Sequence, residues 1–357
     1  MRPVSRQVAL AALASLLAAC ASAPQEMTWF PTESAPAEPA GWPPPPEPRR
    51  LVYAGELVGE SNFRRSEGAR ESSAGRLLRW IVGLGGERRN VVELVRPQTG
   101  TVDSRGRVLV TDAGREGVLV FDEPAGKLDA WNDAGDGVAF RSPVGIVEAG
   151  DGSVLVADSE LGYVVRLDTD GNPVGEFGRG ALSRPTGLAR DPETGDIYVA
   201  DTAAHDIKVF DEAGRLLRTL GGPGTGAGQF NGPTHLCFTG RHLYVADTLN
   251  ARVQVLAPDG SVVSTIGQRG LFLGNMVRPK GVTADRDGNI YVIESYYDHL
   301  LVFSGSGELL LPIGGSGGGA GQFFLPAGAW TDHGHRLFVA DMFNGRVVVL
   351  DYIGEPG

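Results

Sequence analysis

One phrase occurs six times between about residue 97 and residue 351, and it constrains the fold more than any other feature of the chain. Each copy has Pro-x-Gly or a close variant, a turn rich in Asp and Gly, an apolar strand ending in V-A-D or a variant of it, a short loop and a second apolar strand. A repeat of this length is typical of propeller blades rather than helical solenoids. The copies are spaced by roughly 40 to 50 residues and begin at Pro97, Pro143, Pro185, Pro233, Pro279 and Pro326.

Each copy predicts a blade of four short antiparallel strands, called a to d from the axis outward. Segments such as I-Y-V-A-D are rich in β-branched and aromatic residues and are bounded by Gly, Asp and Asn, which is typical of such strands. The sixth copy ends at Asp351, too close to the end of the chain for a fourth strand. The fourth strands of the other copies are predicted at Lys127 to Asn132, Val174 to Gly178, Leu216 to Gly221, Val262 to Gly267 and Leu309 to Gly314.

A propeller leaves an open seam unless the two ends of the chain share a blade. We therefore predict that Leu51 to Leu57 supplies the missing strand, with Leu77 to Gly83 as the alternative. The predicted fold class is all-β: a six-bladed β-propeller of four-stranded antiparallel blades, with the last blade completed by an N-terminal strand.

These repeats resemble a known family. P-x-G, V-A-D-T, N-x-R-V-Q-V and the G-x-G-x-G-Q-F segments at Gly222 to Phe230 and Gly315 to Phe323 are similar to the NHL repeat. The resemblance covers about 260 residues and implies a six-bladed propeller with a tendency to bind other molecules. It does not imply one activity, because that family includes scaffolds, sensor domains, RNA-binding modules and a few enzymes.

The N-terminus has the pattern of a bacterial lipoprotein signal peptide, predicted over residues 1–20. Arg2 and Arg6 precede an apolar run that is too short to span a bilayer, and L-A-A-C ends at Cys20, the expected lipidated residue. Residue 22 is Ser rather than Asp, which in a host with two membranes favours the outer one.

The rest of the chain divides into two predicted parts. Residues 21–50 are rich in Pro, Ala and Glu and are expected to form a spacer that lifts the propeller off the membrane. Residues 51–357 are expected to form the propeller, with residues 58–95 as an insertion whose structure the sequence does not indicate.

Charge and cysteine content narrow the function classes. The net charge of -11 disfavours a general nucleic-acid binder, since attraction to phosphate supplies most non-specific affinity. The chain has two cysteines. With Cys20 acylated, Cys237 has no partner, and its apolar neighbours predict a buried, inert thiol.

Two rings of charge follow from the repeat. An arginine directly precedes the repeat proline in three copies, at Arg96, Arg184 and Arg278, and lies one residue earlier in a fourth, at Arg141. The V-A-D carboxylates form a second ring, at Asp112, Asp158, Asp201, Asp247, Glu294 and Asp341. One interpretation is a charged mouth that binds an anion. The other, which we favour, is a girdle of Arg to Asp pairs that joins neighbouring blades.

Candidate metal sites are weak. His235 replaces the glycine found at this position in most copies, but a metal site needs about three convergent ligands, so we expect a hydrogen-bonded histidine. His333 and His335 share one turn. Asp168 to Asn172 and Asp285 to Asn289 resemble the start of a calcium loop but fit tight turns better. We therefore expect no metal and no cofactor.

The most informative positions are those where blades five and six depart from the repeat. Exposed aromatic and Met side chains beside polar residues are typical of binding hot spots. Alternatively, these side chains fold back over blade edges or lie under the 58–95 insertion. The predicted partner-binding residues are Phe272, Tyr296, Tyr297, His299, Met342 and Phe343.

The expected function is a lipid-anchored scaffold that binds a protein or peptide partner in the bacterial envelope. Its membrane contact would run through the N-terminal lipid, and no nucleic acid is expected. No phosphate loop or nucleophile elbow stands in a suitable context. The alternative is a metal-dependent propeller enzyme, a lyase or lactonase, that uses the central channel.

Overall fold

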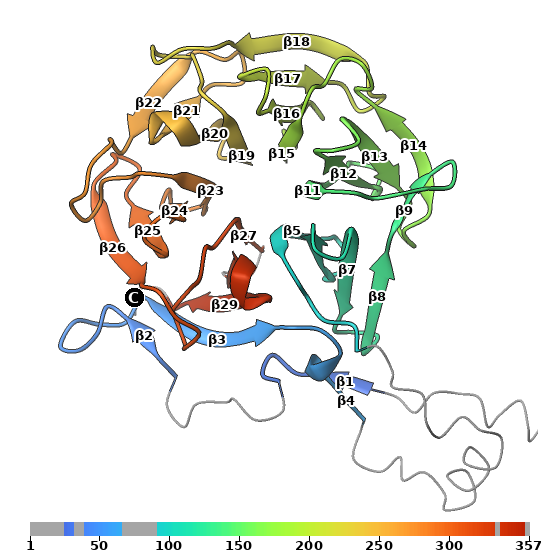
Figure 1. Ribbon diagram of the computed structural model, residues 1–357. Coiled ribbons are helices and arrows are strands. Elements are labelled where there is room, and N and C mark those ends of the chain that lie inside the picture. The colour runs from blue at the N-terminus through green and yellow to red at the C-terminus, as the bar shows by residue number, and fades with distance from the viewer. Residues whose placement is uncertain (1–24, 32–38, 66–90, 333–335, 354–357) are drawn as a thin grey trace, which may run out of the picture.

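The computed structural model describes residues 25–31, 39–65, 91–332 and 336–353 of the protein. Six antiparallel sheets are arranged around a central axis, which confirms the predicted six-bladed β-propeller (Figure 1). Blade one contains β5 (Pro97–Val102), β6 (Val108–Asp112), β7 (Gly117–Asp122) and β8 (Lys127–Trp131). Blade two contains β11 (Pro143–Glu148), β12 (Val154–Asp158), β13 (Tyr163–Leu167) and β14 (Pro173–Phe177).

The next three blades repeat the same order. Blade three contains β15 (Pro185–Arg190), β16 (Ile197–Asp201), β17 (Asp206–Phe210) and β18 (Leu216–Gly221). Blade four contains β19 (Pro233–Thr239), β20 (His242–Asp247), β21 (Arg252–Leu256) and β22 (Val262–Ile266). Blade five contains β23 (Pro279–Ala284), β24 (Ile290–Glu294), β25 (His299–Phe303) and β26 (Leu309–Gly314). The predicted outer strands agree with the structure to within a residue.

Blade six joins the two ends of the chain. Its strands β27 (Ala329–Thr331), β28 (Arg336–Asp341) and β29 (Arg346–Tyr352) are completed by β3 (Leu51–Leu57), which pairs antiparallel with β29. The predicted N-terminal strand therefore closes the propeller. The alternative, residues 77–83, lies outside the described residues.

The core lies between the blades. The second strand of each blade from β6 to β24 is almost wholly buried, whereas an outer strand such as β18 is largely exposed and has one buried residue. Each apolar cluster draws on two neighbouring blades, and the last cluster joins blade six to blade one through Leu57, Phe338 and Val110. A single blade could not bury these faces alone, so the ring must close for the core to form.

The innermost strands approach closely at the repeat glycines. A side chain at Gly145 would lie 2.1 Å from the carbonyl oxygen of Thr186 in the next blade, and one at Gly187 would lie 2.8 Å from His235 Cα. Glycine therefore recurs here because a side chain would push neighbouring blades apart.

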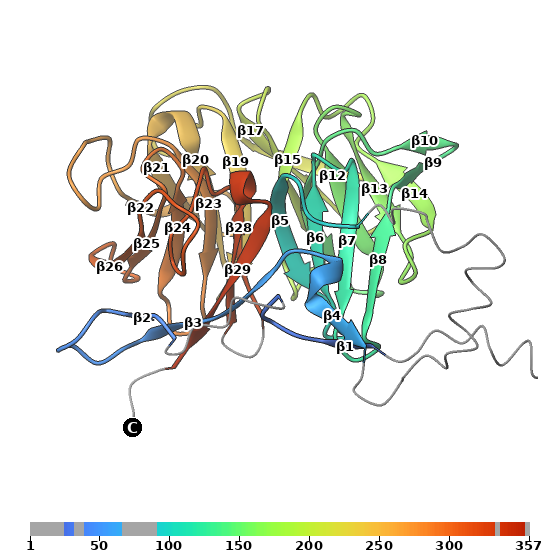
Figure 2. The same cartoon turned by 60° about the horizontal axis from the view of Figure 1, so that its bottom comes forward.

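Two parts of the predicted spacer lie against the propeller (Figure 2). The strand β1 (Gln25–Met27) pairs with β4 (Phe63–Arg65), and β2 (Gly41–Trp42) extends blade six beyond β3. Trp29 packs near Phe338, with ring centroids 6.3 Å apart. This differs from the free spacer expected from composition, because aromatic side chains within the Pro-rich stretch pack, partly buried, against the propeller.

The remaining short elements are β9 (Asp133–Gly135), β10 (Val138–Ala139), η1 (Glu60–Asn62), η2 (Thr248–Asn250) and η3 (Met342–Asn344). Within the described ranges every helix is a single 3-10 turn, and none has the length and apolar character needed to cross a bilayer.

Candidate functional site

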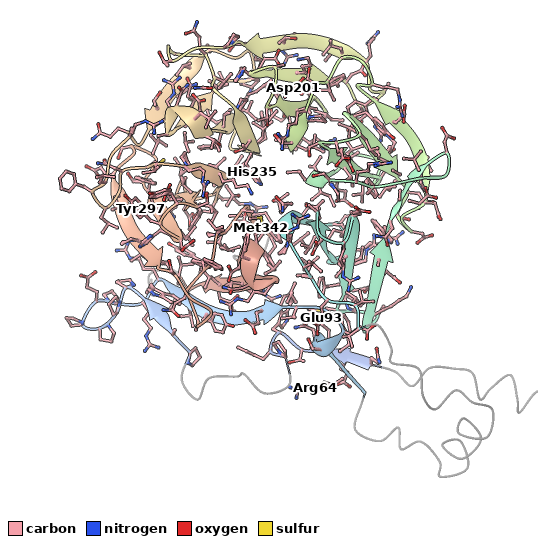
Figure 3. All side chains as sticks on the ribbon, viewed as in Figure 1. Arg64, Glu93, Asp201, His235, Tyr297 and Met342 are labelled. Atoms are coloured by element: carbon pink, nitrogen blue, oxygen red, sulfur yellow. The ribbon has the colours of Figure 1, made fainter. Side chains whose placement is uncertain are left out.

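The V-A-D carboxylates are buried and bind backbone amides rather than the side chains of the arginines that precede the repeat prolines. Asp158 accepts hydrogen bonds from the N–H groups of Arg141, Ser142, Glu160 and Leu161 at 2.7 to 3.0 Å. Asp201, labelled in blade three of Figure 3, accepts from two amides in the same way. The expected girdle of pairs between the pre-proline arginines and these carboxylates is therefore not what the structure shows. The backbone amides at the start of each innermost strand take the acceptor sites.

The arginine side chains that precede the repeat prolines consequently stay on the surface. They lie on the upper face, defined as the face that carries the b–c loops and the connections between blades. Arg96 donates to the carbonyl of Ala113 at 3.2 Å, and Arg278 donates to Ser295 Oγ at 3.1 Å. Arg141 lies 3.8 Å from Glu160, and both of these side chains are exposed.

His235 crosses the channel. Its Nε2 lies 2.8 Å from Thr99 Oγ1, which belongs to the opposite blade, and its Nδ1 lies 3.1 Å from the carbonyl oxygen of Val282 (Figure 3). These partners fit a neutral ring in which Nδ1–H donates to the carbonyl and Nε2 accepts from the threonine hydroxyl. Burial, with a smaller contribution from nearby Lys280, lowers the pKa of His235 to about 4. His235 is thus a neutral crossbar between blades one and four.

Lys280 lies one residue closer to the upper face than the ring position of His235. Its Nζ is 3.5 Å from Gln98 Oε1 and 3.9 Å from Met342 Sδ. Burial, followed by repulsion from Arg278, lowers the pKa of Lys280 to about 8. The channel mouth therefore contains a partly buried amine whose neighbours are neutral or cationic.

Below the crossbar the channel widens into a cavity of about 590 Å³ that reaches the lower face, which carries the a–b and c–d turns. Its wall includes His235 and the hydroxyl groups of several threonines, but not Lys280. Cys237 also lines this cavity and is partly exposed, with Sγ 3.5 Å from Thr283 Oγ1. The expected burial of this thiol is therefore only partial, because Cys237 alternates with Leu236, which points into the core.

The two calcium-like segments on the lower face are turns. Asp168 accepts hydrogen bonds from Asp170 N, Asn172 N and Asn172 Nδ2, and Asp285 accepts from the corresponding atoms of its own turn. Their carboxylates are occupied by their own loops, as expected for Asx turns. In the part of the chain that the structure describes, no three His, Cys, Asp or Glu side chains converge as a metal site would require. His333 and His335 lie outside the described residues, as does Cys20.

A side-chain tie fastens the G-x-G-x-G-Q-F loop of blade four. Asn250 Nδ2 donates to the carbonyl of Gly224 at 2.9 Å, and Arg252 Nη2 donates to that of Gln229 at 2.9 Å. Both side chains also bind the buried carboxylate of Asp247, at 2.8 Å each. The tie explains why N-x-R follows V-A-D when the preceding loop has this glycine pattern.

Blade six repeats the tie with matching geometry. Asn344 Nδ2 lies 2.8 Å from the carbonyl oxygen of Gly317, and Arg346 Nη2 lies 3.0 Å from that of Gln322. Arg346 also reaches Glu56 of the closing strand at 2.7 Å. The same device therefore fixes a surface loop and the propeller seam.

Blade five lacks this tie, and a pocket lies in its place. Tyr297 and His299 stand where blade four has Asn250 and Arg252, and Leu301 stands where it has Gln254. The connection that enters blade five therefore lacks the side-chain hydrogen bonds that Asn250 and Arg252 make to the corresponding loop of blade four. The pocket has a volume of about 270 Å³ and is lined by Leu271, Phe272, Leu273, Gly274, Asn275, Glu294, Tyr297, His299 and Leu301.

The structure brings three of the predicted partner-binding residues together in this pocket: Phe272, Tyr297 and His299. Tyr296 packs edge-on against Tyr297, with ring centroids 4.9 Å apart, and is 57% exposed. Met342 lies apart from them, beside Lys280 and nearer the axis, as Figure 3 shows.

Phe343 is also separate from the pocket and packs against Phe324 in blade six. The predicted partner-binding residues did not include four exposed apolar side chains of the surrounding surface: Leu249, Leu271, Leu273 and Phe324. We call that surface the apolar arc: Leu249, Leu271, Phe272, Leu273, Tyr296, Phe324 and Phe343. The predicted residues also did not include Lys280, although this is the only lysine directly after a repeat proline.

Comparisons with known proteins agree with the fold. The profile of one family, described as NHL repeat, matches residues 182–210. The chain is 34% identical over 88 residues to NHL-repeat-containing protein 4 of Homo sapiens, covering 25% of this chain and 67% of that protein. It is 31% identical over 159 residues to NHL repeat-containing protein 2 of Bos taurus, covering 35% of this chain and 22% of that one. The match thus spans less than a quarter of that larger relative.

A solved structure, virginiamycin B lyase from Staphylococcus aureus, superposes with a TM-score of 0.54 at 16% identity, covering 72% of this chain and 96% of that one. At this identity the similarity concerns the fold alone.

Proposed function

The chain belongs to the NHL-repeat family, and from this premise we propose that it is a binding scaffold for a protein or peptide partner in the bacterial envelope. The supporting observation is the blade-five pocket. It lies where neighbouring blades carry a polar tie, and it is bordered by Phe272, whose side chain is 84% exposed. An apolar pocket ringed by exposed apolar side chains suits the anchor residue of a protein partner.

The scaffold proposal includes a lipid anchor at Cys20. Its support is the basic start, the short apolar run and the L-A-A-C sequence. The partner would then be an envelope protein or peptide. If the host has two membranes, Ser22 favours the outer one.

The pocket can be tested by rebuilding the missing tie. Tyr297→Asn with His299→Arg should fill the space under the loop, as Asn250 and Arg252 do in blade four. Full-length wild type and this double variant would each be used as bait in a detergent extract of the envelope, with retained proteins identified by mass spectrometry. A protein retained by wild type and lost by the double variant is the expected result. Retention of the same set by both would contradict the proposal.

The second candidate, a metal-dependent lyase or lactonase, would act through the channel. The channel imidazole of His235 has both nitrogens in hydrogen bonds to protein groups, which favours a structural role for it. Metal analysis of the purified, delipidated protein separates the two candidates. A stoichiometric metal would favour the enzyme.

A further inference from the structure

The upper mouth of the channel carries cations that no carboxylate neutralises. Arg96, Arg184 and Arg278 occupy blades one, three and five, so they surround the axis at alternate blades. In the described part of the chain, no carboxylate lies within ion-pair distance of these three side chains or of Lys280. The buried V-A-D carboxylates do not serve as counter-ions because backbone amides bind them.

Lys280 makes this mouth a site rather than a solvated rim. The Lys280 side chain is partly buried, and an anion stabilises a charged amine that is partly removed from water. The polar contacts of Lys280 are the 3.5 Å approach to Gln98 Oε1 and the 3.9 Å approach to Met342 Sδ. Neither atom carries a charge, and the nearest arginine that acts on the amine, Arg278, repels it.

The channel mouth has a floor. The hydrogen bond between His235 and Thr99 spans opposite blades directly below the level of Lys280. The lower cavity is walled by His235 and Thr99 and does not include Lys280. An anionic group therefore reaches Lys280 from the upper face.

The lower face of the propeller is rich in acidic groups, whereas the upper channel mouth carries the cations described above. Lower-face turns carry many of the acidic groups behind the net charge of -11, including Asp151, Asp168, Asp170, Asp191, Asp211, Asp259, Asp285 and Asp287. A long polyanion would meet repulsion from the molecule as a whole, whereas a short acidic segment meets only the local cations. Met342 places the mouth beside the apolar arc, so one partner can contact both.

We propose that the upper channel mouth binds carboxylates of an acidic segment of the protein partner, with Lys280 at the centre and Arg96, Arg184 and Arg278 around it. This inference rests on the proposed scaffold function and names the chemistry of its partner. The apolar arc takes the apolar side chains of that partner, and the basic mouth fixes the register of its acidic residues.

The test uses a fluorescein-labelled octaglutamate peptide as the probe and fluorescence anisotropy of the full-length protein at about 20 mM salt, where screening is weak. Wild type should bind octaglutamate and not octaglutamine. Lys280→Met should weaken binding about tenfold, and Arg184→Gln or Arg278→Gln about threefold each, because each removes one local charge. Arg215→Gln, on the lower face, is the matched control and should change nothing.

A second measurement uses the wild-type protein and does not depend on how well Lys280→Met folds. Raising the pH from 7 to 9 should weaken octaglutamate binding, because Lys280 loses its proton near pH 8. His235 stays neutral over this range because its pKa is lowered to about 4, so it does not account for the change. Lys280→Arg should keep the affinity at pH 9.

Three results would overturn the inference: no binding of octaglutamate, equal binding of octaglutamine, or binding that is insensitive to Lys280→Met and to pH. Tighter Lys280-dependent binding of an oligouridylate of equal charge would assign the mouth to nucleic acid instead. The scaffold proposal is tested separately by the rebuilt tie. A partner lost by that double variant but unaffected by Lys280→Met would refute only the basic mouth.

Discussion

At the scale of single residues, the V-A-D carboxylates are the main structural groups of the repeat. Asp158 is fully buried and organises four backbone amides around the loop that leads into blade two. Asp158→Ala should lower the free energy of unfolding by about 3 kcal/mol, since buried amides would lose their acceptor. Urea unfolding measures this. Asp170→Ala, on an exposed turn, should change the value by less than about 0.5 kcal/mol, and equal effects at the two sites would contradict the assignment.

His235 gives a pH-dependent prediction. Its pKa is lowered to about 4, so between about pH 4 and pH 6.5 the unfolded chain binds a proton that the folded protein does not. Stability from this group is therefore complete above pH 6.5 and is lost as the pH falls through that window. The loss should reach about 3 kcal/mol in wild type relative to His235→Gln in urea unfolding at several pH values. Parallel profiles for the two proteins would show that His235 titrates normally.

The repeat pattern predicted which residues form the charged rings but not which atoms they bind. The sequence shows that residue 184 has a guanidinium group and residue 201 a carboxylate. The groups that bind Asp201 are backbone amides, which nearly every residue has, so the sequence does not single them out. The sequence therefore suggested pairing of these carboxylates with arginine side chains, whereas the structure shows them bound to backbone amides. Lys280 was not predicted as a site residue. The other repeats have uncharged residues at this position, and the sequence does not show that the amine lies beside Gln98 and Met342.

At the scale of elements, the sequence predicted that an N-terminal strand closes the propeller. It did not predict the N-terminal wrap, the packing of residues 25–31 and 39–50 against the propeller. The sixth repeat lacks an outer strand, and Leu51 to Leu57 has the alternation that such a strand needs. Residues 25–31 and 39–50 gave no comparable signal. Their proline content obscured the three aromatic side chains, Trp29, Phe30 and Trp42, that pack on the propeller.

Truncation separates these two elements. Removing residues 21–48 deletes the aromatic contacts and should cost about 3 kcal/mol of unfolding free energy, while the protein stays monomeric. Removing residues 21–58 also deletes β3, which exposes the edge of β29 and should cause aggregation. Urea unfolding and size-exclusion chromatography measure both effects. Two truncated proteins of equal stability, both monomeric, would refute closure by β3.

At the scale of the whole molecule, the wrap changes the expected geometry of the lipid anchor. Four residues separate Cys20 from Gln25, which begins the first described strand. An acylated Cys20 would therefore hold the propeller within about 20 Å of the membrane surface, given the reach of an extended chain. The spacer predicted from composition would have allowed a much larger distance.

The anchor itself is a separate prediction. Expressed in a bacterial host that processes lipoproteins, wild type should fractionate with membranes, whereas Cys20→Ser should leave that fraction, because the variant lacks the thiol that carries the lipid. Immunoblots of membrane and soluble fractions measure the difference. Identical partition of wild type and Cys20→Ser would refute the anchor.

The departures from the repeat led to the blade-five pocket but did not show its structure. The sequence shows that blade five has Tyr297 and His299 where blade four has Asn250 and Arg252. That these changes remove a loop tie and leave a pocket required the hydrogen bonds of blades four and six. Phe324 was not predicted, although it stands where the matching segment of blade four has Asn231.

The central claim is that the upper face over blades four to six binds the partner, and an affinity measurement tests it most directly. With the partner retained by wild type, isothermal titration should show Kd rising about tenfold for Phe272→Ala and for Tyr296→Ala, with the melting temperature unchanged, because both side chains are exposed anchors. Leu216→Ala, an exposed apolar residue on the outer strand of blade three, should leave Kd unchanged. Unchanged Kd for both aromatic variants, or an equal loss with Leu216→Ala, would contradict the account.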